Sequence, residues 1–280
     1  MSRLVFTLLS ALLLVAGLAR EARASEVAVD LYTIGQGSYL YASYGHSVLC
    51  VRDVEDSPSA RTGRCYDYGI ADRQDALSIL WESVRARAIF TPVEVTEEVM
   101  IRAFADQGRA IERQRLPLSA EEARALADRL AREVATRHAY AYHPYYANCA
   151  TQLRDRIDEA TAGRLRPGRA VVEKAPCRER MEEGLSGRLL ELTGLALIMG
   201  TPNERVPSPW EAMYLPAALR DGVAERFGAP VERVEERQAV ILPTSPAIGR
   251  IALFFFALLL FAVVRLGARR GRLRLAVGVA

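Results

Sequence analysis

Apolar and polar positions alternate in the first part of the chain after residue 25 and follow a helical period over most of the rest. Alternation predicts strands over residues 26–34, 46–52 and 65–69, with two more over 89–95 and 237–242. A helical period is found over residues 72–88, 96–114, 150–163, 177–184, 187–199 and 209–220. A capping box at Ser119 and Glu122 opens a further helix that runs to about residue 136. A β-rich opening followed by helices predicts an α+β domain.

The first residues have the composition of an export signal. Arg3 precedes an apolar stretch over residues 4–18, and the small residues Ala22 and Ala24 follow at the spacing that signal peptidase prefers. We therefore expect residues 1–24 to be a signal peptide that is cleaved before Ser25. The exported domain is predicted to cover residues 25–242.

A second apolar segment lies near the other end of the chain. Residues 251–264 are wholly apolar and stand between Arg250 and Arg265. Fourteen helical residues measure only ~21 Å, which is short of the ~30 Å hydrocarbon layer, but flanking arginines that snorkel extend the reach of the helix. We expect a linker over 243–250, a transmembrane helix over 251–268 and a cytoplasmic basic tail over 269–280, because five arginines follow the apolar core. A buried core helix is the alternative.

Charge and composition exclude several classes of function. The formal net charge is only +3, and the arginines of the C-terminal tail exceed it, so nucleic acid is not expected as a partner. The three histidines are scattered without the spacing of a metal site. The chain has no glycine-rich phosphate loop and no Gly-x-Ser-x-Gly elbow. We expect neither a metal nor a cofactor.

Cys149 is the candidate nucleophile. It follows Asn148, which can cap the helix that begins there, and a thiol on the first helical turn is favoured as the thiolate. His46, at the start of a predicted strand, is the candidate base. His138 and His143 are competing bases because they lie closer to Cys149 along the chain, although their tyrosine-rich loop is also typical of an interfacial aromatic belt.

Four cysteines in an oxidising compartment also allow two disulfides. Cys50 and Cys65 lie on consecutive predicted strands, so a bridge between them is geometrically natural. Antiparallel pairing of these cysteines sets His46 opposite Gly69 and makes Asp67 a diagonal neighbour at ~7–8 Å, where it could orient the imidazole. A Cys149–Cys177 bridge is the structural alternative to a catalytic thiol.

Four motifs together resemble the N-terminal periplasmic domain of the Lnb-type lipoprotein N-acyltransferases. They are Tyr44-Gly45-His46-Ser47, Tyr66-Asp67-Tyr68-Gly69, Arg113-Gln114-Arg115-Leu116-Pro117-Leu118-Ser119 and Tyr146-Ala147-Asn148-Cys149-Ala150-Thr151, and the likeness extends to about residue 221. A histidine on an early strand followed by a distant Asn-Cys at a helix start is also similar to circularly permuted papain-like enzymes. These resemblances imply a permuted papain-like, NlpC-like domain with a helical elaboration.

The resemblance also implies an activity. Cys149, with His46 and Asp67, is expected to take a fatty acyl chain from a phospholipid as a thioester and to pass it to the N-terminal cysteine amine of a lipoprotein. Tyr68 and Asn148, within the same motifs, are expected to contact substrate. The resemblance implies the bacterial inner membrane as the location, with the catalytic domain in the periplasm. An NlpC-type amidase acting on peptidoglycan and a non-catalytic, disulfide-braced membrane module are the alternatives.

Overall fold

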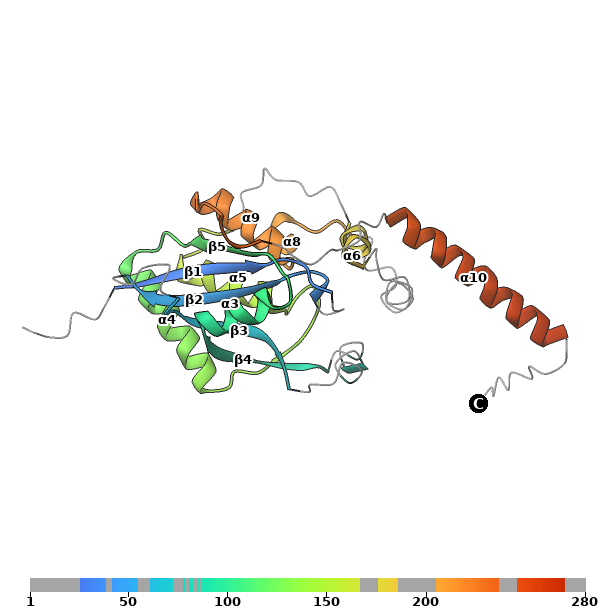
Figure 1. Cartoon of the computed structure of the whole chain (residues 1–280), viewed down its shortest axis with the longest axis horizontal. Coiled ribbons are helices and arrows are strands. Elements are labelled where there is room, and N and C mark those ends of the chain that lie inside the picture. The colour runs from blue at the N-terminus through green and yellow to red at the C-terminus, as the bar shows by residue number, and fades with distance from the viewer. Residues whose placement is uncertain are drawn as a thin grey trace, which may run out of the picture.

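An antiparallel sheet forms the centre of the computed structural model, which describes residues 26–38, 42–54, 61–72, 78, 81–82, 85, 87–166, 176–185, 205–236 and 246–269. Within these residues the sheet has seven strands in the order β6-β4-β3-β2-β1-β5-β7. Figure 1 labels the strands β1 to β5 of this sheet. The strands are β1 (Val27–Ile34), β2 (His46–Asp53), β3 (Arg64–Ala71), β4 (Ile89–Thr96), β5 (Ile111–Arg115), β6 (Tyr140–Ala141) and β7 (Glu232–Glu235). The described chain is therefore an α+β fold built on one antiparallel sheet.

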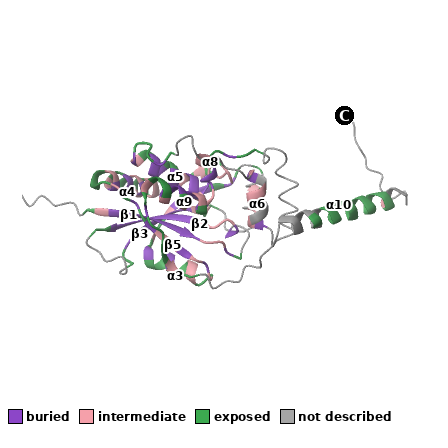
Figure 2. Ribbon diagram, turned by 90° about the horizontal axis from the view of Figure 1, so that it is seen from above, coloured by how far each residue is buried: buried purple, intermediate pink, exposed green. Residues whose placement is uncertain are grey.

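Helices cover both faces of this sheet (Figure 2). On one face Leu31, Leu49 and Tyr66 pack against α4 (Ala120–Ala135), α5 (Cys149–Ala160) and α9 (Pro216–Phe227). On the other face Tyr32, Val48 and Cys50 pack against α3 (Glu97–Ala105). Successive residues of β1 and β2 point to opposite faces, so each strand contributes to both cores. Burial is therefore continuous along β1 and β2 and does not alternate as the sequence pattern predicted, because helices cover both faces of these strands.

Two predicted helices are wrong in part. Residues 96–114 are not one helix, because α3 ends at Ala105, Gly108 follows with φ of 65°, and β5 then pairs with β1. Residues 209–220 are divided into α8 (Pro209–Ala212) and α9, and Pro216 begins the second helix. Proline at the first helical position is favourable, whereas inside a helix it removes a hydrogen bond. Neither β6 nor β7 was expected from the alternation of apolar residues.

Several predicted segments lie outside the described residues. These are the signal peptide over residues 1–24, most of the helix over 72–88, the helix over 187–199, the strand over 237–242, residues 243–245 of the linker, and the tail beyond residue 269. Residues 246–250 of the predicted linker are described and are helical. The helix predicted to begin at Cys177 is present as α6 (Cys177–Leu185).

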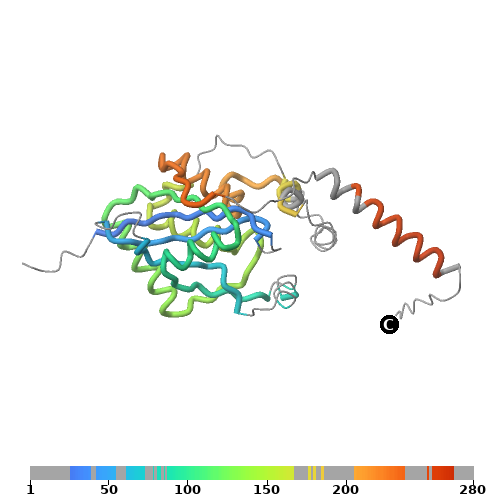
Figure 3. The backbone as a smooth tube through the Cα atoms, viewed as in Figure 1, coloured from blue at the N-terminus to red at the C-terminus, as the bar shows by residue number. Residues whose placement is uncertain are grey.

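The last described element is α10 (Pro246–Arg269), which extends away from the sheet on the side of α6 (Figure 3). It includes the predicted transmembrane segment 251–268. Its apolar side chains are exposed, among them Phe254 and Phe261. Among the helices that the structure describes, none has the combination of length and hydropathy that crossing a membrane demands. The transmembrane helix therefore stays a prediction.

Candidate active site

Cys149 is the first residue of α5 and is a free, partly exposed thiol. Its position is fixed by Asn148, the N-cap, whose Oδ1 accepts the amide of Thr151 at 3.0 Å. Asn148 Nδ2 donates to the carbonyls of Pro144, at 2.8 Å, and Tyr214, at 2.9 Å. The side chain of Asn148 therefore ties the start of α5 to the preceding loop and to the chain that follows α8.

The first amides of α5 are available for a ligand. A helix leaves its first N–H groups without intrahelical partners. In the described structure the amide of Thr151 is capped by Asn148, whereas those of Cys149 and Ala150 bond to no described residue. These two amides lie beside the thiol at the positive end of the helix dipole. They are suited to hold an oxyanion that forms on a carbonyl attacked by Cys149.

His46 and Asp67 are brought together by the pairing of β2 and β3. The register joins Leu49 to Tyr66 and Cys50 to Cys65, and a disulfide links that cysteine pair. At the end of these strands His46 Nε2 lies 2.8 Å from Asp67 Oδ1. The same carboxylate oxygen accepts the amide of Gly69 at 2.6 Å. The diagonal relation that the sequence predicted for His46 and Asp67 is therefore found in the structure.

Electrostatics couple His46 to both neighbours. Burial alone would lower the pKa of His46, but attraction to Asp67 and Cys149, and hydrogen bonds with both side chains, raise it to about 10. Burial would raise the pKa of Asp67, but His46 and the Gly69 amide hold it below its usual value. Because Nε2 of His46 is bonded to Asp67, Nδ1 is the nitrogen left for the thiol. The three side chains thus form a Cys-His-Asp triad.

The competing histidines have other surroundings. His143 Nδ1 accepts the amides of Tyr145, at 3.2 Å, and Tyr146, at 3.3 Å, and burial lowers its pKa. His138 is exposed beyond the end of α4. Cys177 is free and buried at the start of α6, so the alternative Cys149–Cys177 bridge is not formed. The structure therefore pairs Cys149 with His46.

Tyr68 and Asn148, the expected substrate contacts, both have structural partners. Tyr68 is fully buried, its hydroxyl donates to Glu133 at 2.6 Å, and the Arg156 guanidinium lies 4.4 Å above its ring. Asn148 is 8% exposed, and its side-chain amide is engaged in hydrogen bonds with Thr151, Pro144 and Tyr214. Contact with substrate through either side chain would require the loss of these bonds, so such contact stays a prediction.

Two features of the site were missed from the sequence. Gly69 lies against the His46 ring, where a Cβ atom would come within 2.5 Å of Cε1. The predicted register had set Gly69 opposite His46, and a glycine inside a strand often marks a close approach of another group, so this contact could have been predicted. The second feature is the Tyr140 hydroxyl, which donates to the Tyr68 carbonyl from the tyrosine-rich loop. The sequence of that loop gives no indication that it folds back onto β3.

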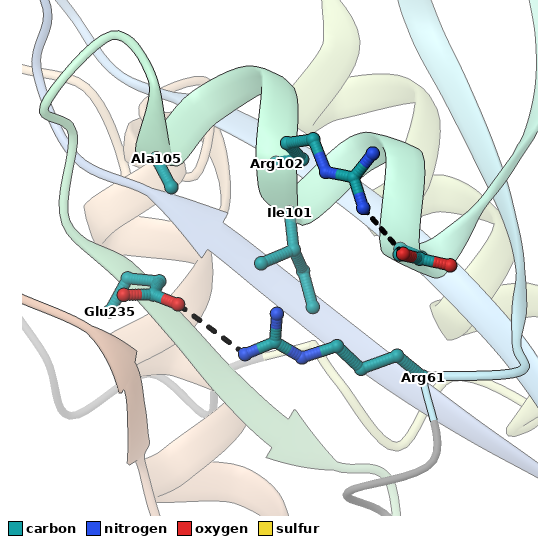
Figure 4. Close-up of a pocket in the computed structure, with 6 residues that line it drawn as sticks. Arg61, Ile101, Arg102, Ala105 and Glu235 are labelled. Atoms are coloured by element: carbon teal, nitrogen blue, oxygen red, sulfur yellow. Dashed lines mark hydrogen bonds and ion pairs between the residues drawn. The ribbon is translucent and has the colours of Figure 1, made fainter.

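A hollow of about 410 Å³ lies apart from the triad, beside α3 and β7. It is lined by Arg61, Glu98, Ile101, Arg102, Ala105 and Glu235. Figure 4 shows Arg61 directed toward Glu235, and Arg102 forms an ion pair with Glu98. The charged side chains that line the hollow are paired with each other, and none of the triad residues lines the hollow. Cys149, rather than this hollow, is therefore the candidate reactive site. Among the residues that the structure describes, no group of His, Cys, Asp and Glu side chains has an arrangement that could hold a metal ion.

Comparison with known protein families gives a match. The model of the Lnb N-terminal periplasmic domain matches residues 17–174, a segment that contains all three triad residues. No curated protein and no solved structure matches the chain. The matched segment covers more than half of the 280 residues and ends after α5. The chain therefore belongs to the family of proteins with an Lnb N-terminal periplasmic domain.

Proposed function

We propose that this protein is a thiol acyltransferase that moves a fatty acyl chain from a phospholipid, through a thioester on Cys149, to the N-terminal cysteine amine of a lipoprotein. One observation carries the proposal: a free thiol at a helix N-terminus is paired with His46, and Asp67 orients that histidine. Family membership adds a periplasmic, lipoprotein-related setting.

The first half-reaction transfers the acyl group to the enzyme. With a pKa of about 10, His46 carries its proton at neutral pH and pairs with the Cys149 thiolate. The sulfur attacks the ester carbonyl, and the amides of Cys149 and Ala150 hold the oxyanion, each such donor being worth about 3 kcal/mol. As the C–O bond breaks, His46 gives its proton to the departing oxygen. A lysophospholipid leaves, and a thioester and neutral His46 remain.

The second half-reaction restores the enzyme. The neutral amine of the acceptor cysteine attacks the thioester carbonyl, and the same amides hold the new oxyanion. His46 takes the proton from the attacking nitrogen while the C–S bond breaks. The products are the amide-linked lipoprotein and the thiolate–imidazolium pair with which the cycle began. Asp67 keeps the same ring nitrogen of His46 directed at the thiol throughout.

Attachment to the inner membrane, with the domain in the periplasm and the C-terminus in the cytoplasm, is part of the proposal. The exposed apolar side chains of α10 support contact with lipid. Both proposed substrates are confined to a bilayer, so a membrane-held enzyme meets them at a high effective concentration. Such confinement also reduces the entropic cost of orienting the reacting groups.

Intact-mass spectrometry after incubation with phospholipid tests the proposal. The wild type is expected to gain one fatty-acyl mass that hydroxylamine removes, and Cys149→Ser is expected to gain none that hydroxylamine removes. Addition of a lipopeptide with a free N-terminal cysteine should discharge the adduct and increase the peptide mass by one acyl chain. Cys177→Ser is the matched control because it removes the other free thiol. The absence of any adduct on reduced, folded wild type would contradict the proposal.

A Cys-His-Asp triad would also serve an NlpC-type amidase acting on peptidoglycan. Such an enzyme should cleave a peptidoglycan peptide through Cys149 whether or not phospholipid is present. A non-catalytic, disulfide-braced module predicts that no cysteine is free, whereas the structure has Cys149 and Cys177 as thiols. The free triad thiol is the reason that we favour an enzyme.

A further inference from the structure

The strand that carries Asp67 contains a β-bulge next to the triad. Pairing of β3 with β4 joins Asp67 to Val93 and resumes with Ile70 opposite Thr91. Two residues of β3, Tyr68 and Gly69, therefore oppose the single residue Pro92 of β4. Proline has no N–H, so the strand partner offers no donor to the bulge at this position. A buried carbonyl here must find its donor elsewhere.

Tyr140 supplies that donor. It lies on β6, where it pairs with Phe90 of β4, and its hydroxyl reaches the carbonyl of Tyr68. Burial above all, and then the nearby Cys149, raise the pKa of Tyr140 well above its usual value. The hydroxyl therefore keeps its proton and remains a donor throughout the physiological pH range.

The peptide that Tyr140 holds determines where the triad residues lie. Tyr68 is the residue between Asp67 and Gly69, and the Gly69 amide donates to Asp67 Oδ1 at 2.6 Å. Gly69 also forms the surface on which the His46 ring rests. Rotation of the Tyr68 peptide would shift the carboxylate that orients His46 and the surface that supports it at the same time.

We propose that Tyr140 is a positioning residue, whose hydroxyl fixes the β3 bulge and through it the orientation of His46 by Asp67. The inference rests on the proposed function, because it gives the role of a residue in the same catalytic site. The groups that face His46 are Asp67 from β3, the Cys149 thiol from α5 and the Phe104 ring from α3, at 5.7 Å between ring centroids. The nearby Arg109 also lowers the pKa of Asp67.

Tyr140→Phe tests the inference, because it removes the hydroxyl and keeps the ring. The His46 ring is titrated by NMR, and alkylation of Cys149 by iodoacetamide is followed by peptide mapping between pH 5 and 10. We expect the pKa of His46 to fall toward its ordinary value. The ratio of the Cys149 alkylation rate at pH 6 to that at pH 9 should fall roughly tenfold. Neither readout needs an acyl donor or acceptor, so failure of the acyltransferase proposal leaves this test intact.

Tyr32→Phe is the matched control. Its buried hydroxyl donates to Glu97, away from the bulge, so it should lower stability without moving the His46 titration. In an Asp67→Asn background Tyr140→Phe should have little further effect on His46, because Tyr140 acts through Asp67. If Tyr140→Phe does not fold, 4-aminophenylalanine at position 140 retains a donor and should preserve the wild-type profile. A Tyr140→Phe protein with wild-type His46 titration and alkylation ratio would overturn the inference.

Discussion

The imidazole of His46 occupies the space that a side chain on Gly69 would fill. A Cβ atom at Gly69 would lie 2.5 Å from Cε1 of His46 and 3.1 Å from Oδ1 of Asp67. Contacts below 3.0 Å require that one of the atoms moves, and here the first atom to move belongs to the proposed base. Gly69 is therefore required for close approach rather than for a special backbone angle.

Gly69→Ala is expected to displace His46 and to reduce acyl-adduct formation on Cys149 more than about 100-fold, because misplacing a catalytic group by about 1 Å costs that much. The rate is measured by intact mass after incubation with phospholipid. Gly228→Ala is the control, since Gly228 is left-handed, with φ of 64°, and has no atom near its added methyl. It should lose about 1 kcal/mol of stability but keep the rate. Equal rates for Gly69→Ala and wild type would contradict this role of Gly69.

Asn148→Ala should both destabilise the domain and misplace Cys149. The change removes the N-cap of α5 and leaves the carbonyls of Pro144 and Tyr214 without that donor. We expect a loss of about 2 kcal/mol in the free energy of unfolding, measured with urea, and a large fall in Cys149 alkylation. Ser119→Ala removes the corresponding cap of α4, far from the thiol, and should cost about 1 kcal/mol with no change in alkylation. Parallel losses of reactivity in both variants would refute a specific effect of Asn148.

The His46–Asp67 pair should make stability depend on pH. The folded-state pKa of His46, about 10, lies above its ordinary value of 6.5, so its contribution is full below about pH 6.5 and is lost as pH rises toward 10. Urea denaturation of wild type across this window should show a decline of up to about 1.4 kcal/mol per pH unit from this group. His46→Gln should remove that part of the decline. If the two proteins lose stability in parallel, His46 does not have a raised pKa.

Removal of the Cys50–Cys65 bridge should lower stability by about 3 kcal/mol, the usual value for a loop of this length. The two cysteines are 15 positions apart and are buried on the face that packs against α3. The measurement is urea denaturation of wild type, with and without dithiothreitol, beside a Cys50→Ala/Cys65→Ala variant. The variant should not respond to dithiothreitol, whereas wild type should become as unstable as the variant. A wild type indifferent to the reductant would show that the bridge contributes no stability.

The sequence correctly predicted those helix caps and strands that depend only on residues close together in the chain. The capping box at Ser119, the N-cap at Asn148 and the strand propensity of β1, β2 and β3 each depend on a few neighbouring residues, and the structure contains these caps and strands. Pairing of Cys50 with Cys65 fixed a register, and that register was enough to place His46 near Asp67.

Elements that depend on distant partners could not be predicted in this way. The residues of β5 are mostly polar, and their strand conformation comes from pairing with β1 on one side and β7 on the other. The Tyr140 hydroxyl reaches β3 because β6 pairs with β4, over a separation that no local pattern encodes. The bulge at Tyr68 and Gly69 lies opposite Pro92 of β4, a residue distant in sequence from β3, so no local pattern of β3 indicates it.

The bridge between Cys50 and Cys65 lies on the same two strands as His46 and Asp67. A slip of one residue between β2 and β3 would turn these two side chains to opposite faces of the sheet, since side-chain direction repeats every second residue. It would also separate the two sulfur atoms, so only the productive register can be crosslinked. Formation of this bond therefore selects the register that places His46 beside Asp67. In a reducing compartment this crosslink would not form, so an oxidising location and the placement of His46 beside Asp67 are linked through the same bond.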